Sequence, residues 1–242
     1  MSKRVALMLA TMAAQLVWIN ASWRSGLMPP DSPVVQGVLV HGPMLIVAGV
    51  ALVLAVRRGL FTPAELGLEA PAWTMRCGRA GRVLLLLAIF LAGALIDISG
   101  PLGTMTANGM SYSEIVHHLF RYEYRYIYGR LEPPLSTWDV GVHAVSTIVF
   151  PPLTEEIPYR ALFIPVALSR LSRSGAAMAS GVVFFLYHWL AGWAPHPAFF
   201  LHGWAFAWAF MLVGLAGSIA AHAGVLLGVV VLGTFAGFAS TP

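Results

Sequence analysis

Apolar stretches long enough to cross a lipid bilayer occupy most of this sequence. A membrane-spanning helix needs about 20 consecutive, largely apolar residues. Of the 242 residues, 58% are hydrophobic and only 10% are charged, whereas about one-quarter of an ordinary soluble domain is charged. A soluble core could not bury so much apolar surface, so the sequence predicts an all-α, polytopic bundle of transmembrane helices. The stretches number about seven, or eight if the fourth divides at Pro151-Pro152, and they cover residues 4–22, 34–56, 82–99, 138–170, 175–193, 197–215 and 217–238.

Positive charges between the stretches predict the orientation of the chain. The positive-inside rule places the amino terminus in the cytoplasm, together with the basic residues that should share that side. These are Lys3, Arg4, the arginines of residues 57–82, Arg170 and Arg173. The formal net charge of +4 would favour nucleic acid as the partner of a soluble protein, but here the arginines flank membrane helices, so the expected partner is the lipid bilayer. Arginine far outnumbers lysine, as in GC-rich bacterial genomes, and we expect a multi-pass protein of the bacterial inner membrane.

Ionisable side chains inside the apolar stretches indicate function rather than packing. Each costs roughly 2.5–3.5 kcal/mol to insert at the centre of a membrane helix, so such residues mark functional sites by default. They fall in three successive regions of the carboxyl-terminal half: Glu155, Glu156 and Arg160, then His188, then His222. An acid pair followed by two histidines is a set of side chains from which one hydrolytic site can be built.

Helical geometry predicts different environments for the two glutamates. Residues four apart share a helix face, so Glu156 should pair with Arg160. Glu155 is rotated by about 100° from Glu156 and cannot share that arginine equally well. Glu155 is therefore predicted to face a separate polar cavity as a general base, while Glu156 neutralises the arginine. A charge pair that only joins helices is the alternative for this cluster.

Prolines surround the acidic pair. Pro151, Pro158 and Pro165 recur every seven residues, and Pro152 stands beside the first of them. Each proline inside a helix frees the carbonyl four residues earlier. In lipid, these carbonyls must be met by protein groups or by water. The fourth stretch is therefore predicted to be a broken, proline-rich helix beside a water-containing cavity.

The histidines follow in helices of their own. Phe184 precedes His188 by four residues, so the ring can brace the imidazole on one helix face. His222 lies among small residues that allow close helix approach. His202 is a further candidate near a helix end. Taken singly, each histidine is as typical of a hydrogen bond between helices as of catalysis.

The three regions together resemble the CAAX protease and bacteriocin-processing family of membrane proteins. The pattern of that family is Glu-Glu-x-x-x-Arg, then Phe-x-x-x-His, then His-x-x-x-Asn or Asp. The chain supplies Glu155, Glu156 and Arg160, then Phe184 and His188, then His222. The resemblance covers about residues 138–235, which makes residues 138–242 the expected catalytic core. Residues 1–137 contribute membrane helices and polar connections without a recognised motif.

The resemblance implies an intramembrane endopeptidase of glutamic type that cuts a membrane-anchored protein or peptide. Glu155 would activate a water molecule, His188 would orient that water and share proton transfer, and His222 would stabilise the oxyanion. Glu156 and Arg160 would hold the helix geometry. Glu155 and His188 lie about 20–23 Å from the cytoplasmic flank at 1.5 Å per residue, in the outer half of a core of about 30 Å. That depth favours cleavage near the extracytoplasmic face, as in sorting proteases that trim carboxyl-terminal anchors.

Two positions depart from the family pattern, and they leave alternatives open. Leu226 stands where the family has Asn or Asp, and Pro158 stands inside the first motif. Losing one oxyanion donor costs on the order of 10²–10³ in rate. Either His202 or a backbone group replaces that donor, or the chain is an inactive member that acts as an immunity or scaffold protein. A small transporter with a proton relay is disfavoured because no inverted repeat is found.

No cofactor is expected. The single cysteine, Cys77, excludes an intramolecular disulfide and a cysteine-based metal cluster. Zinc bound by one glutamate and the two histidines is the alternative, but no His-Glu-x-x-His motif is present and these ligands are widely scattered along the chain.

Overall fold

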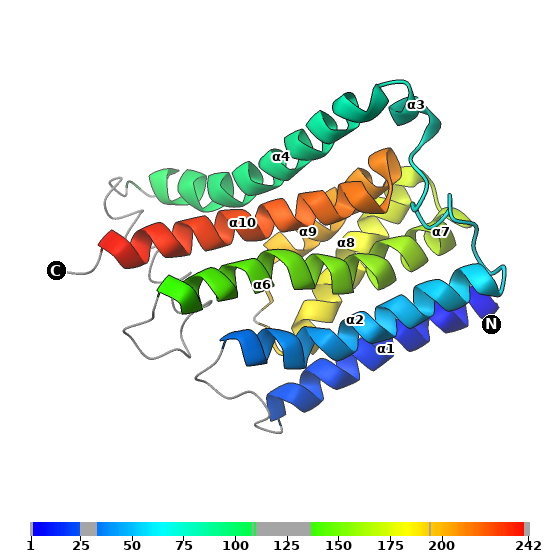
Figure 1. The fold of residues 1–242 in the computed structure, drawn as a ribbon, viewed down its shortest axis with the longest axis horizontal. Coiled ribbons are helices and arrows are strands. Elements are labelled where there is room, and N and C mark those ends of the chain that lie inside the picture. The colour runs from blue at the N-terminus through cyan, green and yellow to red at the C-terminus, as the bar shows by residue number, and fades with distance from the viewer. Residues whose placement is uncertain (1, 25–32, 108, 110–136, 194, 240–242) are drawn as a thin grey trace.

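The helices pass back and forth along one common direction to form a bundle (Figure 1). The computed structural model describes residues 2–24, 33–107, 109, 137–193 and 195–239. In this part of the chain every regular element is helical and no β-strand occurs. The helices are α1 (Lys3–Arg24), α2 (Pro33–Arg57), α3 (Ala72–Met75), α4 (Gly78–Ala107), α6 (Thr137–Glu156), η2 (Ile157–Leu162), α7 (Phe163–Leu168), α8 (Arg173–Leu190), α9 (Pro197–Val213) and α10 (Leu215–Ala239).

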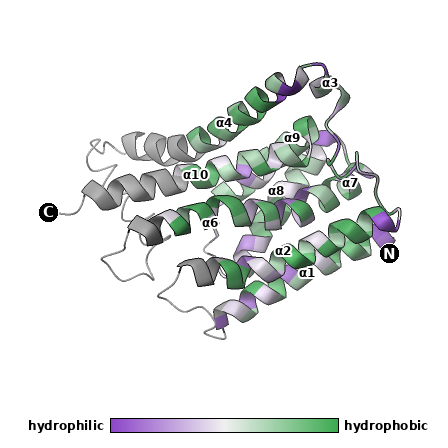
Figure 2. Ribbon diagram, viewed as in Figure 1, coloured by the Kyte–Doolittle hydropathy of each residue, from purple (hydrophilic) through white to green (hydrophobic). Residues whose placement is uncertain are grey.

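The described helices confirm the predicted helical membrane bundle. Three of them contain windows long and apolar enough to cross a membrane: Lys3–Ser22, Val38–Arg57 and Gly78–Ile96. Two shorter apolar helical segments, Pro197–Val213 and Leu215–Gly228, stand beside them. Hydrophobic residues dominate the length of these helices (Figure 2). The chain is therefore a helical membrane protein. Residues 112–130, whose sequence is amphipathic, lie outside the described residues.

The fourth apolar stretch is broken, as predicted, but at a different place. Pro151 and Pro152 lie inside α6, and the α-helix ends at Glu156. The next six residues, Ile157–Leu162, form a π-helical segment before α7 begins. Pro158 accounts for this position, because its ring cannot donate to the carbonyl of Thr154 and crowds it. Such π-helical turns inside an α-helix are rare and are frequent at functional sites.

Close packing of α4 against α10 sets the position of the last helix. A Cβ added at Gly224 would meet the backbone oxygen of Phe90, and one added at Gly93 would meet the backbone oxygen of Ala221. Small residues allow this approach in membrane helices. The remaining extensive helix pairs are α8 with α9, α10 with α9, α2 with α6, α10 with α6, and α1 with α2. Since α10 contacts α4, α6 and α9, its residues reach the middle of the bundle.

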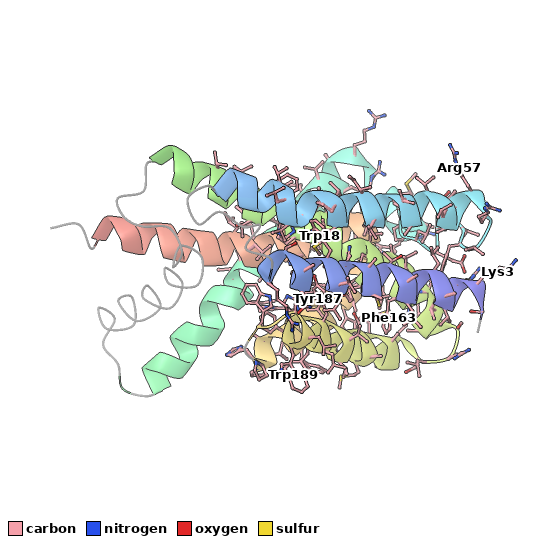
Figure 3. The ribbon with its side chains drawn as sticks, turned by 90° about the horizontal axis from the view of Figure 1, so that it is seen from below. Lys3, Trp18, Arg57, Phe163, Tyr187 and Trp189 are labelled. Atoms are coloured by element: carbon pink, nitrogen blue, oxygen red, sulfur yellow. The ribbon has the colours of Figure 1, made fainter. Side chains whose placement is uncertain are left out.

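One end of the bundle collects the amino terminus and several connections. Lys3 at the start of α1 and Arg57 at the end of α2 lie at the same end (Figure 3). An ion pair of 2.9 Å between Arg4 and Glu65 joins α1 to the connection after α2. The pKa of Glu65 is lowered, chiefly by the backbone N–H of Thr62 and further by Arg4. This end carries the basic residues that the sequence assigns to the cytoplasm.

Candidate active site

The acidic motif lies where α6 passes into η2. Glu155 and Glu156 are the last two residues of α6, and Arg160 belongs to η2. Glu156 and Arg160 are fully buried, and 7% of Glu155 is exposed. Helices α8, α9 and α10 each contact η2. The break in the fourth stretch therefore places the motif at the meeting point of the carboxyl-terminal helices.

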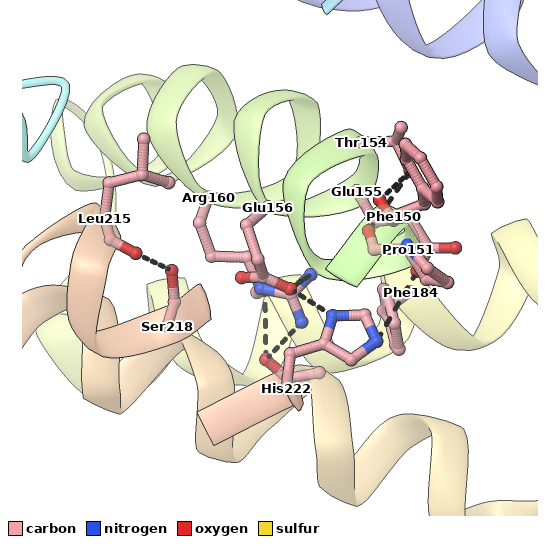
Figure 4. Close-up of polar contacts among 12 residues, drawn as sticks. Phe150, Pro151, Thr154, Glu155, Glu156, Arg160, Phe184, Leu215, Ser218 and His222 are labelled. Carbon is pink, nitrogen blue, oxygen red and sulfur yellow. Dashed lines mark hydrogen bonds and ion pairs between the residues drawn. The ribbon is translucent and has the colours of Figure 1, made fainter. Parts of the chain in front are cut away.

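Glu156 links two of the predicted site residues through a single carboxylate oxygen. Its Oε1 lies 3.2 Å from Nη1 of Arg160, which confirms the pairing predicted from their spacing. The same Oε1 lies 2.8 Å from Nδ1 of His222 (Figure 4). Because the carboxylate only accepts, Nδ1 of His222 carries the proton of this hydrogen bond. Glu156 thus holds an arginine and a histidine from different helices in place.

Glu155 faces the other side of the same imidazole. Its Oε2 lies 4.0 Å from Nε2 of His222. Both carboxylates therefore meet His222, but at different nitrogens of its ring, and a separate polar cavity at Glu155 stays a prediction. Oε2 of Glu155 is buried and has no hydrogen-bond partner among the described residues. The geometry leaves it available to accept a proton from a small molecule.

Aromatic rings compensate the buried charge of Arg160. Its guanidinium carbon lies 4.4 Å from the ring centre of Phe184 and 5.1 Å from that of Phe206. Nη2 also donates to the carbonyl of Gly203 at 3.5 Å. A desolvated cation over aromatic faces is attracted by their quadrupoles. Together with Glu156, these contacts balance a charge that would otherwise be costly inside a membrane helix bundle.

Phe184 connects the two catalytic-candidate histidines. Its ring centre lies 4.4 Å from that of His188 and 5.9 Å from that of His222. The predicted bracing of His188 is therefore present, and the same ring also touches the second histidine and Arg160. Nδ1 of His188 is 2.9 Å from the backbone oxygen of Phe184. In the neutral ring this contact leaves Nε2 as the lone-pair nitrogen.

His188 and His202 approach the glutamates less directly than His222 does. Within the described part of the chain, His188 makes no hydrogen bond or ion pair with either glutamate. It stacks on Phe199 at 4.1 Å instead. His202 stacks on Phe206 at 5.9 Å, and Phe206 stacks on His222 at 4.6 Å. Each of these histidines is therefore separated from His222 by one aromatic ring, which is Phe184 for His188 and Phe206 for His202.

Two buried polar side chains at the site were missed by the sequence analysis. Gln15 of α1 is fully buried, and its Nε2 donates to the carbonyl of Thr154 at 2.9 Å. The hydroxyl of Tyr187 is buried without a hydrogen-bond partner among the described residues, and Tyr187 lies within electrostatic reach of Glu155. Both are polar groups in apolar helices. A search that includes neutral polar residues as well as ionisable ones would have found them.

The described residues offer no ready metal site. No group of three His, Cys, Asp or Glu side chains in this part of the chain is arranged to hold a metal ion. Glu155 and Glu156 converge on His222, and His188 lies beyond the ring of Phe184. The residues named in the zinc alternative therefore do not form a ligand set in this structure.

Comparison with known proteins identifies one matching family. Residues 137–228 match a family model described as type II CAAX prenyl endopeptidase Rce1-like. The match begins at the start of α6 and ends within α10, so it includes every motif residue from Glu155 to His222. Gln15 and helices α1, α2 and α4 lie outside it. No curated protein and no solved structure matches the chain.

Proposed function

Through residues 137–228 this membrane protein belongs to the CAAX protease and bacteriocin-processing family, and on this basis we propose that it is an intramembrane endopeptidase that uses glutamate-activated water. The observation that carries the proposal is the convergence of both glutamates on His222, at 2.8 Å for Glu156 and 4.0 Å for Glu155. Buried carboxylates oriented around one imidazole suit general acid–base chemistry.

Glu155 acts as the base. Its Oε2, which has no hydrogen-bond partner in the described part of the chain, accepts a proton from water, and the resulting hydroxide attacks the carbonyl carbon of the scissile peptide bond. When the tetrahedral intermediate collapses, the protonated Glu155 returns this proton to the leaving amine nitrogen. His188 helps to orient the water and shares in proton transfer through Nε2, since its Nδ1 is bonded to the Phe184 carbonyl.

His222 supplies the positive charge for the oxyanion. Its Nδ1–H is bonded to Glu156, so it is Nε2 that must donate to the substrate oxygen. Protonation at Nε2 makes the ring cationic, and the Glu156 carboxylate stabilises that cation directly. Preorganised donors of this kind stabilise the charge that develops in acyl-transfer transition states.

The substrate is a membrane-anchored protein or peptide. The site lies inside the bundle, and His188 is fifteen residues along α8 from Arg173, about 22 Å at the rise of an α-helix. The protein lies in a bacterial inner membrane with the basic end of the bundle facing the cytoplasm. Cleavage therefore takes place near the extracytoplasmic face. Trimming of a carboxyl-terminal membrane anchor fits this depth.

A non-catalytic role as an immunity or scaffold protein is the second candidate. One residue favours it: Leu226, one turn after His222 on α10, has no side-chain donor where the family has Asn or Asp. The buried Glu155 disfavours it. In the motif, Arg160 is already paired with Glu156, so a merely structural site would gain little from a second carboxylate.

The test is made in cells that express the full chain, with the wild type compared to Glu155→Gln and His188→Ala. Intact membrane proteins should accumulate in both variants, as read by quantitative proteomics of the membrane fraction. Glu65→Gln is the matched control, because it changes a glutamate outside the bundle interior. This variant should process substrates normally. If both site variants insert at wild-type levels and leave the processed proteins unchanged, the protease assignment is wrong.

A further inference from the structure

Two prolines in membrane helices leave carbonyls without their α-helical donors, and α1 supplies a side-chain donor to each. The carbonyl of Leu39 would pair with the N–H of residue 43, which is proline. Nε1 of Trp18 donates to it at 3.2 Å and shares its proton with the carbonyl of Val40 at 3.1 Å. The carbonyl of Thr154 would pair with the N–H of residue 158, which is also proline. There the donor is Nε2 of Gln15, at 2.9 Å. At both positions α1 supplies a donor to a carbonyl to which a proline of a neighbouring helix cannot donate.

The Gln15 side chain is held in one orientation. It is fully buried, and Nε2 also lies 3.4 Å from the carbonyl of Met44 in α2. Because both neighbours are carbonyl oxygens, only the NH₂ group of the amide can face them. The NH₂ group of Gln15 therefore links α1 both to α2 and to the end of α6.

Thr154 is the residue immediately before the glutamate pair. Its hydroxyl is bonded back to the carbonyls of Phe150 at 3.0 Å and Pro151 at 3.1 Å. That hydroxyl therefore cannot satisfy the Thr154 carbonyl. A backbone carbonyl without a donor is costly in a membrane interior, where water is scarce. The bond from Gln15 fixes the backbone at the point where Glu155 and Glu156 leave it.

We propose that Gln15 is a positioning residue for the glutamate pair. It provides from α1 the hydrogen bond that Pro158 withholds from Thr154, and it thereby holds the junction between α6 and η2 in the geometry that directs both carboxylates at His222. This places part of the active-site scaffold outside residues 137–228, the segment that matches the family. Its effect on turnover rests on the proposed function, whereas the anchoring of the junction is a property of the fold alone.

A double-mutant cycle between Gln15 and Pro158 tests the proposal. The full chain is purified in lipid nanodiscs as wild type, Gln15→Leu, Pro158→Ala and the double variant. Hydrogen exchange is followed by mass spectrometry in peptides that cover residues 154–162. Gln15→Leu should speed exchange about tenfold, in line with the loss of a buried hydrogen bond. Pro158→Ala restores an N–H that can bind the Thr154 carbonyl, so the double variant should return to within about twofold of the wild type.

Thr11→Val is the matched control on the same helix. Thr11 is also buried in α1, but among the described residues its hydroxyl bonds only the carbonyl of Leu7 in its own helix. Its removal should leave exchange at residues 154–162 unchanged. If Gln15→Leu behaves like Thr11→Val, or if the effects of Gln15→Leu and Pro158→Ala simply add, the proposal is wrong. If Gln15→Leu alone fails to insert, recovery of insertion in the double variant supports the proposal, and continued failure there overturns it.

The same variants separate this proposal from the proposed function. Processing of membrane proteins in cells should fall in Gln15→Leu and recover in the double variant, a rescue that a general loss of stability would not produce. If exchange is rescued while Glu155→Gln leaves processing intact, Gln15 anchors the junction but the protein is not a Glu155-dependent protease. If Glu155→Gln blocks processing and Gln15→Leu changes neither readout, the protease assignment stands and the role of Gln15 fails.

Discussion

At the scale of single residues, the two adjacent glutamates differ in what holds them. One oxygen of Glu156 contacts both the guanidinium of Arg160 and the imidazole of His222. Glu155 approaches only the far nitrogen of that imidazole, at 4.0 Å. The same substitution made at each position can therefore distinguish the roles of the two glutamates.

We expect Glu156→Gln to unfold the protein more easily and Glu155→Gln to leave it stable but inactive. Removing one partner of a buried ion pair costs roughly 3–5 kcal/mol, because the other charge stays buried. Glu156→Gln strips that partner from Arg160, whereas Glu155→Gln does not. Thermal unfolding in detergent and processing in cells distinguish the two, and equal losses of stability would contradict the separate roles.

Substitution can also identify the group that donates to the oxyanion in place of the side-chain donor that Leu226 lacks. The Tyr187 hydroxyl is a buried donor in electrostatic reach of Glu155, and none of the described residues accepts from it. If it serves the oxyanion, Tyr187→Phe should slow processing on the order of 10²-fold, the effect of losing one such donor elsewhere. Leu226→Asn should change little in the wild type and restore part of the rate in Tyr187→Phe. Tyr159→Phe removes the hydroxyl of the neighbouring buried tyrosine, which is also in electrostatic reach of Glu155, and so tests whether the effect is specific to Tyr187. Normal processing by Tyr187→Phe would exclude the hydroxyl as a donor.

At the scale of elements, the position of His222 depends on how closely α10 packs against α4. Gly224 lies two residues after His222, and a Cβ there would collide with the backbone of Phe90. We expect Gly224→Ala to destabilise the protein by about 1–3 kcal/mol, the range for overpacking a close contact. It should also impair processing, because α10 carries His222 away from Glu156. Thermal unfolding and the cell assay measure both effects.

Gly49→Ala is the control for this substitution. Gly49 lies in α2, and a Cβ there would meet nothing within 4 Å. Alanine is the better helix former, so this variant should be as stable as the wild type or slightly more stable. A Gly224→Ala variant that matched it in both assays would show that the close contact with α4 does not position His222.

The boundaries of five helices followed from the sequence, but the contacts between helices did not. Apolar stretches gave the extent of α1, α2 and α8–α10 to within a few residues because lipid selects for length and hydrophobicity alone. The pairing of Glu156 with Arg160 followed from the helical repeat. The hydrogen bond from Glu156 to His222 joins residues 66 apart, and no local period indicates such a contact.

The break in the fourth stretch shows the same limit. Four prolines made a broken helix predictable, yet only the three-dimensional structure distinguishes Pro158 from Pro151 and Pro152. The carbonyl that Pro158 frees meets a donor from α1, which is 139 residues away from it in sequence. That donor, Gln15, is neutral, so a search restricted to ionisable residues passes over it although an amide in lipid is also costly to leave unpaired.

At the scale of the whole molecule, the orientation of the bundle decides from which side a substrate is cut. Cys77 is a free, exposed cysteine between α3 and α4. Helix α3 lies at the same end of the bundle as the amino terminus (Figure 1), the end where Lys3 and Arg57 also lie (Figure 3). The positive-inside rule places this end in the cytoplasm. We therefore expect a membrane-impermeant maleimide to label Cys77 in inside-out vesicles and to leave it unlabelled in intact spheroplasts.

The opposite result is expected for a cysteine at the other end of the bundle. Helix α8 runs from Arg173 to Leu190, 18 residues, or about 27 Å at the rise of an α-helix, so we expect Pro195 to lie across the membrane from Cys77. In a Cys77→Ser background, Pro195→Cys should react in intact spheroplasts and not in sealed inside-out vesicles. Reversal of both labelling patterns would invert the topology and move Glu155 to the cytoplasmic half of the bilayer. Cleavage would then take place near the cytoplasmic ends of substrate anchors, which excludes the extracytoplasmic processing proposed above.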